Sequence, residues 1–148
     1  MIKILFVCHG NICRSTCAQS VFTYYIEEAG LSDLFQVDSA ATSREEIGNP
    51  PHYGTVRKLA EKGIPLVPHR ARQMTRKDYL EFDYLIGMDS ANIRNMERIA
   101  GGDPQSKIYK MLEFAGSSLD VADFEATYLD VTAGCEGLLK EIRKKYRL

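Results

Sequence analysis

The chain has 148 residues, of which 45 % are apolar and 26 % are charged, and its 19 basic and 20 acidic residues give a net charge of −1. This composition excludes a disordered, collagen-like or coiled-coil chain, and the length predicts a single domain over residues 1–148 with its own core. The near-neutral charge argues against a nucleic-acid partner, and no apolar run near the N-terminus suits a signal peptide or membrane helix. We therefore expect a cytoplasmic monomer without membrane or nucleic-acid partners, whose four cysteines are reduced.

Strands and helices alternate along the predicted chain. Ile2–Cys8 is a nearly continuous apolar run, typical of a strand buried on both faces. The polar loop His9–Ser15 leads into a helix over Thr16–Ala29, which Gly30 ends. The later elements are strand Gln36–Ala40, loop Thr42–Pro51, helix His52–Lys62, a short helix opened by the capping-box sequence Thr75–Asp78, strand Tyr84–Met88, helix Ser90–Ala100, strand Lys107–Met111 and helix Phe124–Tyr146.

This alternation predicts an α/β fold with three layers, in which helices cover both faces of a four-stranded parallel sheet. Ligands bind such sheets beyond the carboxyl ends of the strands. The loop that follows the first strand is therefore the first place to expect a binding site.

That loop, called the phosphate loop below, has the sequence Cys8, His9, Gly10, Asn11, Ile12, Cys13, Arg14, Ser15. Gly10 and Asn11 accept left-handed backbone angles, which lets successive amides face one centre and bind an anion. The helix start that follows also favours an anion. A five-residue arc from Cys8 to Arg14 would place a sulfur below a phosphorus atom and a guanidinium beside its oxygens. The alternative is a chance spacing in which Cys8 is only a small core residue.

The segment FVCHGNICRS, residues 6–15, resembles the signature of the low-molecular-weight protein tyrosine phosphatases. Further matching blocks follow in the family's order, at Val37–Ser43, Ile47–Pro50, His69–Thr75, Phe82–Arg94 and Asp123–Tyr128. The resemblance covers essentially the whole chain and implies the family's four-stranded parallel sheet. It also implies hydrolysis of phosphomonoesters through a phosphocysteine, without a metal or other cofactor. The substrate would be a phosphorylated protein or a small aryl phosphate, with inorganic phosphate as product or inhibitor.

The resemblance assigns the catalytic roles within the phosphate loop. Cys8 would be the nucleophile, and Arg14 would bind the phosphate and stabilise charge in the transition state. The Ser15 hydroxyl would donate to the sulfur, although Ser15 also suits a plain helix N-cap. The phosphate would be bound by His9, Gly10, Asn11, Ile12, Cys13, Arg14 and Ser15, with His9 contributing only its backbone.

Polar residues within the arc and outside it would hold its shape. Asn11 is expected to hold the shape of the loop through its side chain. The resemblance implies that His69 supports this network, and the alternative is a surface histidine. Asp89 and Asn92 fit a helix cap, and the resemblance adds a role in tying down the loop.

The other cysteines include one redox candidate, Cys13, and one core candidate, Cys17, while Cys135 stands alone in the last helix. The family uses a pair like Cys8 and Cys13 for reversible oxidation, and Cys17 is expected in the core. Arsenate reductases of this fold need an additional redox cysteine pair in the C-terminal half. This chain has only Cys135 there, which argues against that activity.

The chain departs from the family where the general acid should lie. The family reads Asp-Pro followed by aromatics before the last helix, whereas residues 117–125 read SSLDVADFE. Asp123 is then either the remaining acid or only the cap of that helix, and Asp120 is a weaker candidate. The family commonly has proline at the position of Thr16. It also often has, where this chain has Ser43–Glu46, an aromatic residue that forms one wall of the substrate cleft.

The sequence thus predicts a protein tyrosine phosphatase, impaired if the short segment leaves it without an acid. Two alternatives stay open. One is a protein-arginine phosphatase of the same fold, a branch that tends to have threonine in place of Ile12, whose apolar bulk suits an aromatic leaving group. The other is a phosphate-binding protein with little turnover.

Overall fold

The computed structural model describes residues 1–122 and 126–148, and in this part of the chain four parallel strands form one sheet in the order β2-β1-β3-β4. These strands are β1 (Ile2–Cys8), β2 (Phe35–Ala41), β3 (Tyr84–Gly87) and β4 (Ile108–Lys110). The central position of β1 explains its unbroken apolar run, because both of its faces are covered.

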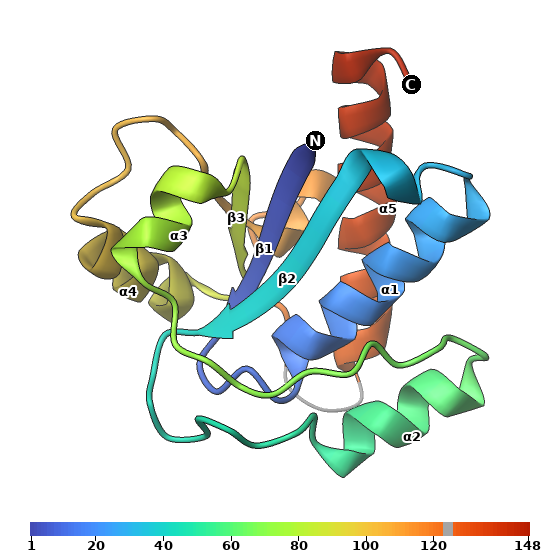
Figure 1. Ribbon diagram of the computed structural model, residues 1–148, viewed down its shortest axis with the longest axis horizontal. Helices are drawn as coiled ribbons and strands as arrows, with labels where there is room; N and C mark the ends of the chain where they lie inside the picture. The colour runs from blue at the N-terminus through green and yellow to red at the C-terminus, as the bar shows by residue number, and fades with distance from the viewer. Residues whose placement is uncertain (123–125) are drawn as a thin grey trace.

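Helices form the two outer layers (Figure 1). The helices α1 (Arg14–Glu28) and α5 (Thr127–Tyr146) lie on one face, with α2 (Tyr53–Glu61) beside α1, whereas α3 (Arg76–Glu81) and α4 (Ser90–Ala100) lie on the other. Alternate residues of β1 serve the two cores: Ile4 and Phe6 pack with α1 and α5, and Leu5 and Val7 pack with α3 and α4. The predicted three-layer α/β fold is confirmed.

Some element boundaries differ from those predicted. The first helix begins two residues early, so that Arg14 and Ser15 lie inside α1. Two short 3-10 helices, η1 (Ser32–Leu34) and η2 (Met111–Ala115), have no counterpart in the prediction, because such short turns leave no periodic pattern. The strand predicted over Lys107–Met111 is shorter because Met111 already begins η2. The predicted start of the last helix at Phe124 lies outside the described residues.

Two glycines set the position of α5 against η2. A Cβ at Gly137 would overlap the carbonyl oxygen of Phe114, and a Cβ at Gly134 would lie 2.5 Å from Met111 Cε. The backbones can approach this closely only because both positions lack a side chain. This contact fixes how far α5 can slide or rotate on the rest of the fold.

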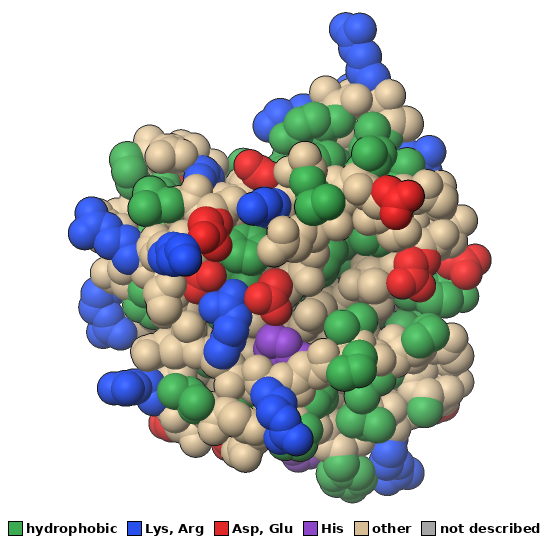
Figure 2. Space-filling view, viewed as in Figure 1, with side chains coloured by type: hydrophobic (Ala, Val, Ile, Leu, Met, Phe, Trp, Pro, Cys, Tyr) green, Lys and Arg blue, Asp and Glu red, His purple; other side chains and the backbone are tan. Residues whose placement is uncertain are grey.

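The surface carries charges of both signs. Lysine and arginine side chains gather over α3 and α4, at the left edge of the molecule in Figure 2, with acidic side chains close by. This mixture matches the near-neutral net charge. None of the helices among the described residues has both the length and the apolarity to cross a membrane.

Candidate active site

The thiol of Cys8 lies at the carboxyl end of the central strand, inside the curve of the phosphate loop. The residue is only 3 % exposed, and its carbonyl accepts a hydrogen bond from Thr42 N at 2.9 Å. The sulfur lies 3.3 Å from Asn11 N, which donates to it, and 3.1 Å from the Ser15 hydroxyl oxygen. Two polar groups thus converge on the sulfur, and both can donate to it when it is a thiolate.

Asn11 is the structural centre of the loop. Its amide nitrogen donates to Ser15 Oγ at 2.8 Å and to Ser39 Oγ at 2.9 Å, while its oxygen accepts from His69 Nε2 at 2.7 Å and from Arg72 N at 3.2 Å. The fully buried side chain therefore uses both amide hydrogens and both lone pairs. This network ties the loop to α1, to β2 and to the segment 69–72.

Only one of the two residues expected to take left-handed angles does so. Asn11 has a φ of 58°, whereas Gly10 is not among the residues with positive φ. A Cβ at Gly10 would lie 3.3 Å from Glu46 Cγ, a tight contact that the Glu46 side chain would have to relieve by a small shift. The expectation of a left-handed angle at Gly10 was wrong, and Asn11 alone of the two makes the left-handed turn.

Ser15 is the second residue of α1 and does not cap it. The N-cap position belongs to Cys13, so the interpretation of Ser15 as a plain N-cap is wrong. Because Asn11 Nδ2 donates to Ser15 Oγ, the hydroxyl hydrogen of Ser15 can point to Cys8. The arrangement matches the role that the family resemblance implies for Ser15.

Arg14 opens α1 and is anchored from two directions. Its Nη1 donates to Asp89 Oδ2 at 2.8 Å and to the carbonyl of Val121 at 3.2 Å. Asp89 is also the N-cap of α4, where its other oxygen accepts from Asn92 N at 2.7 Å. The predicted cap is therefore present, and the same carboxylate also orients the arginine of the phosphate loop.

His69 lies inside the network and not on the surface, since its side chain is 10 % exposed. Because Asn11 Oδ1 is the acceptor, Nε2 of His69 carries the hydrogen. Burial lowers the pKa of His69 and nearby Arg72 lowers it further, against the opposing charge of Asp38. The surface interpretation of His69 was wrong, and the neutral ring is the favoured form.

Cys17 and Cys135 are both buried. Burial raises the pKa of Cys17 to about 12, and it also raises the pKa of the fully buried Cys135. Both are thiols at neutral pH with the weak reactivity of core residues. The expectation that Cys17 lies in the core agrees with this geometry.

The rim of the loop is held by contacts that the sequence did not reveal. The carbonyl of His9 accepts hydrogen bonds from Ser43 N and Ser43 Oγ. The ring Nε2 of His9 lies 3.0 Å from Glu45 Oε2. On the other side, His52 N donates to the carbonyl of Ile12 at 2.6 Å. No local motif marks these partners, because they meet only when the chain folds.

Of the two acid candidates, Asp123 lies outside the described residues. Asp120 Oδ1 accepts hydrogen bonds from Ser90 N, Ser90 Oγ and Lys110 Nζ at 3.0, 3.1 and 3.0 Å. The hydrogen bond from Lys110 holds the pKa of Asp120 below its usual value. An ionised carboxylate engaged in this way is a poor proton donor at neutral pH. The next residue, Val121, donates its N–H to the carbonyl of Met88 at 2.8 Å.

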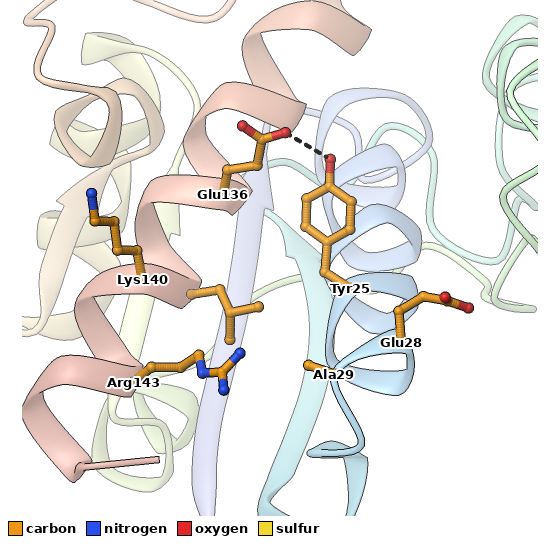
Figure 3. Close-up of a pocket in the computed structure, with 7 residues that line it drawn as sticks. Tyr25, Glu28, Ala29, Glu136, Lys140 and Arg143 are labelled. Carbon is orange, nitrogen blue, oxygen red and sulfur yellow. Dashed lines mark hydrogen bonds between the residues drawn. The ribbon is translucent and has the colours of Figure 1, made fainter.

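Two hollows are lined by residues of α1 and α5. One, with a volume of about 640 Å³, adjoins the phosphate loop at Ile12 and Cys13. The other, of about 660 Å³, lies between α1 and α5, where the Tyr25 hydroxyl donates to Glu136 Oε1 at 3.4 Å (Figure 3). Tyr25 lies near the end of α1, whereas the phosphate loop lies at its start. The first hollow is therefore the one that can share a ligand with Cys8.

Comparison with known proteins gives a consistent picture. The model of the family described as low molecular weight phosphotyrosine protein phosphatase matches residues 3–148. The low molecular weight protein-tyrosine-phosphatase YfkJ of Bacillus subtilis is 39 % identical over 157 aligned positions that cover 100 % of both chains. The human low molecular weight phosphotyrosine protein phosphatase is 36 % identical, with 94 % of both chains covered.

Solved structures share the same fold. The crystal structure of YfkJ from Bacillus subtilis superposes with a TM-score of 0.93 at 40 % identity, covering 98 % of this chain and 96 % of that one. A drosophila arginine phosphatase superposes with a TM-score of 0.85 at 27 % identity, covering 96 % of this chain and 98 % of that one.

Proposed function

Because the chain belongs to the low molecular weight phosphotyrosine protein phosphatase family, we propose that it hydrolyses phosphotyrosine with Cys8 as the nucleophile. The observation that carries this proposal is the convergence of Asn11 N and the Ser15 hydroxyl on the buried sulfur. Arg14, which Asp89 orients, begins the helix on the same loop. A phosphate held by the loop amides would have this sulfur as its nearest nucleophile.

In the first step, the thiolate of Cys8 attacks phosphorus. The S–P bond forms while the bond between phosphorus and the phenol oxygen breaks, and the phenol oxygen takes the electron pair and a proton. Arg14 and the loop amides stabilise charge on the equatorial oxygens. Asp123 is the candidate proton donor, and a phenol without a donor leaves slowly.

In the second step, water attacks the phosphocysteine. The new P–O bond forms as the S–P bond breaks, which releases inorganic phosphate and restores the thiolate. Hydrogen bonds from Ser15 and Asn11 favour the sulfur as a leaving group, because they stabilise its negative charge. The proton of the attacking water passes to the same acid-base residue or to solvent.

Ile12 favours phosphotyrosine over phosphoarginine as the substrate. Its apolar side chain borders the hollow beside the loop, where a phenol ring gains more from apolar contact than a charged guanidinium does. An arginine phosphatase is among the structural neighbours, so phosphoarginine is the proper comparison substrate. We further propose that the enzyme acts as a cytoplasmic monomer on phosphorylated proteins or small aryl phosphates, and that it needs no metal.

Substitution of Cys8 tests the mechanism. Cys8→Ser should abolish hydrolysis of an aryl phosphate while leaving vanadate or phosphate binding largely intact, because Arg14 and the loop amides remain. Acid quenching during turnover, followed by mass spectrometry, should find the phosphoryl group on Cys8 of the wild type. Cys13→Ser is the matched control and should still form the intermediate. Full activity in Cys8→Ser, or activity lost to a chelator, would contradict the mechanism.

A further inference from the structure

The hollow beside the phosphate loop adjoins the proposed catalytic site through Ile12 and Cys13. These two residues line one part of it, the beginning of α2 lines another, and Tyr128 of α5 lines a third. The hydrogen bond from His52 N to the Ile12 carbonyl joins α2 directly to the loop. A group in this hollow would therefore lie next to a tyrosine whose phosphate is bound over Cys8.

The hollow combines aromatic walls with positive charge. Tyr53 is 66 % exposed, and its ring lies against His52, with centroids 5.4 Å apart. The guanidinium carbon of Arg57 lies 5.7 Å from the centroid of the Tyr53 ring. Arg57 is thus held over an exposed aromatic face at the rim, with its hydrogen-bonding edge available to a ligand.

In the described part of the chain, no carboxylate lines the hollow to balance this charge. Among the described residues that line it, Arg57 and Lys58 are the charged ones and neither Asp nor Glu occurs. Lys58 has a neighbour outside the lining, since its Nζ lies 3.4 Å from Glu61 Oε2. Arg57 forms no ion pair with any carboxylate of the described part of the chain, so it is the stronger candidate for binding an anion.

We propose that this hollow binds an acidic side chain of the substrate protein close to its phosphotyrosine, and that Arg57 is the cation that recognises it. This inference rests on the proposed function and adds a substrate class to it: phosphotyrosine with a neighbouring Asp or Glu. A carboxylate accepts two parallel hydrogen bonds from a guanidinium, and Tyr53 and Tyr128 offer apolar surface to the peptide around it. The family often has an aromatic cleft wall where this chain has Arg44 and Glu45. The rings of Tyr53 and Tyr128 provide aromatic walls in this chain.

Matched phosphopeptides test the assignment. Each pair carries Glu or Gln at one position within about three residues of phosphotyrosine, a reach of roughly 10 Å in an extended chain. For the best position, kcat/KM of the wild type should be about three- to tenfold higher for the Glu peptide. This ratio should shrink as salt is added, because the rim is exposed to solvent.

The ratio should fall to about one in Arg57→Gln. It should stay at the wild-type value in Arg94→Gln, which removes an exposed arginine from α4 on the other face of the sheet. Because a ratio is compared within each protein, any change in the shared chemistry cancels. Equal ratios in the wild type and Arg57→Gln would overturn the assignment of Arg57.

A binding measurement separates this inference from the proposed function. Cys8→Ser is titrated with the same peptides, so that affinity is read without turnover. Tighter binding of the Glu peptide that depends on Arg57 supports the docking site even if the wild type hydrolyses phosphotyrosine slowly. Binding of both peptides with equal affinity would overturn the docking site alone. Failure of every phosphopeptide to bind would overturn both proposals.

Discussion

The environment of the Cys8 sulfur depends on one buried amide. Asn11 donates to Ser15, which faces the sulfur, and its own backbone N–H also points at the sulfur. The φ of 58° at Asn11 and its four side-chain hydrogen bonds therefore both help to place hydrogen-bonding groups at the Cys8 sulfur. The backbone angle and the side-chain network can be separated by substitution, because glycine accepts that angle without a side chain.

Asn11→Gly should keep the left-handed turn and lose the network. Removing the amide takes one hydrogen-bond partner from each of four groups, which should lower the free energy of unfolding by about 2–4 kcal/mol. These groups are the side chains of Ser15, Ser39 and His69 and the backbone N–H of Arg72. We expect kcat/KM for an aryl phosphate to fall at least about tenfold, since Ser15 is no longer held against Cys8. Urea denaturation and steady-state kinetics measure both effects. Unchanged kinetics in a destabilised variant would show that the network serves stability alone.

His69 should make the stability of the fold depend on pH. Its pKa is lowered in the folded chain, so the unfolded chain binds more protons between that value and an unfolded pKa of about 6.5. The stabilisation from His69 is therefore complete above about pH 6.5 and is lost as the pH falls through the folded pKa. In His69→Gln, whose amide can still donate to Asn11, this part of the pH dependence should vanish. Urea denaturation at a series of pH values compares the two proteins, and equal slopes would contradict the assignment.

At the scale of elements, Asp89 couples the start of α4 to the phosphate loop. One carboxylate oxygen caps the helix and the other holds Arg14. A helix cap can be made by several residue types, whereas the pairing with Arg14 needs the charge. The two functions therefore predict different effects for two substitutions at this position.

Asp89→Ser should keep the cap and lose the ion pair. Its free energy of unfolding should fall because the buried Arg14 guanidinium loses its carboxylate partner, and kcat/KM should fall about tenfold because Arg14 is no longer oriented. Asp89→Ala should show the same kinetic defect and should lose a further ~1 kcal/mol of stability. Thermal unfolding and steady-state kinetics separate the two. If Asp89→Ser retains full activity, Asp89 acts as a cap only.

The elements that the sequence predicted best are those with local signals. The observed bounds of Ile2–Cys8 and Ser90–Ala100 match the prediction, because a doubly buried apolar run and a capped, glycine-ended helix are encoded within the segment. In the site, Cys8, Arg14 and Asn11 came from one contiguous motif. The contacts of Asn11 with Ser39 and of His9 with Glu45 join residues far apart in the chain, so they required the folded structure.

At the scale of the whole molecule, we expect the short segment before α5 to determine how the leaving group is protonated. A positioned general acid contributes about 10²–10⁴-fold to the rate, and the phenol of tyrosine, with a pKa of about 10, needs one more than a nitrophenol does. Asp120 is engaged by Lys110 and Ser90, which leaves Asp123 as the candidate. We expect rates that depend steeply on the pKa of the leaving group, with phosphotyrosine slow and phosphocysteine accumulating.

A series of aryl phosphates measures this dependence. The wild type should give a steep plot of log kcat/KM against the pKa of the leaving group, a burst of phenol, and little change in Asp123→Asn. Asp120→Asn serves as the control and should leave the slope unchanged. A flat plot, together with a loss of orders of magnitude in Asp123→Asn, would instead show that Asp123 is the general acid.

The chain on either side of this segment is joined by two hydrogen bonds, from Ala122 N to Asp130 Oδ2 at 3.2 Å and from Thr127 Oγ1 to the Ala122 carbonyl at 2.6 Å, and each side also has an anchor of its own. Val121 is held by Met88 and Arg14, and α5 is fixed against η2 by Gly134 and Gly137. Neither anchor depends on how many residues lie between Ala122 and Thr127, and a longer loop there adds only a small closure entropy, roughly 0.6 kcal/mol for each doubling of its length. This junction is therefore a natural graft point, where an insertion carrying an acid could change the speed of the enzyme while the phosphate loop and its scaffold stay in place.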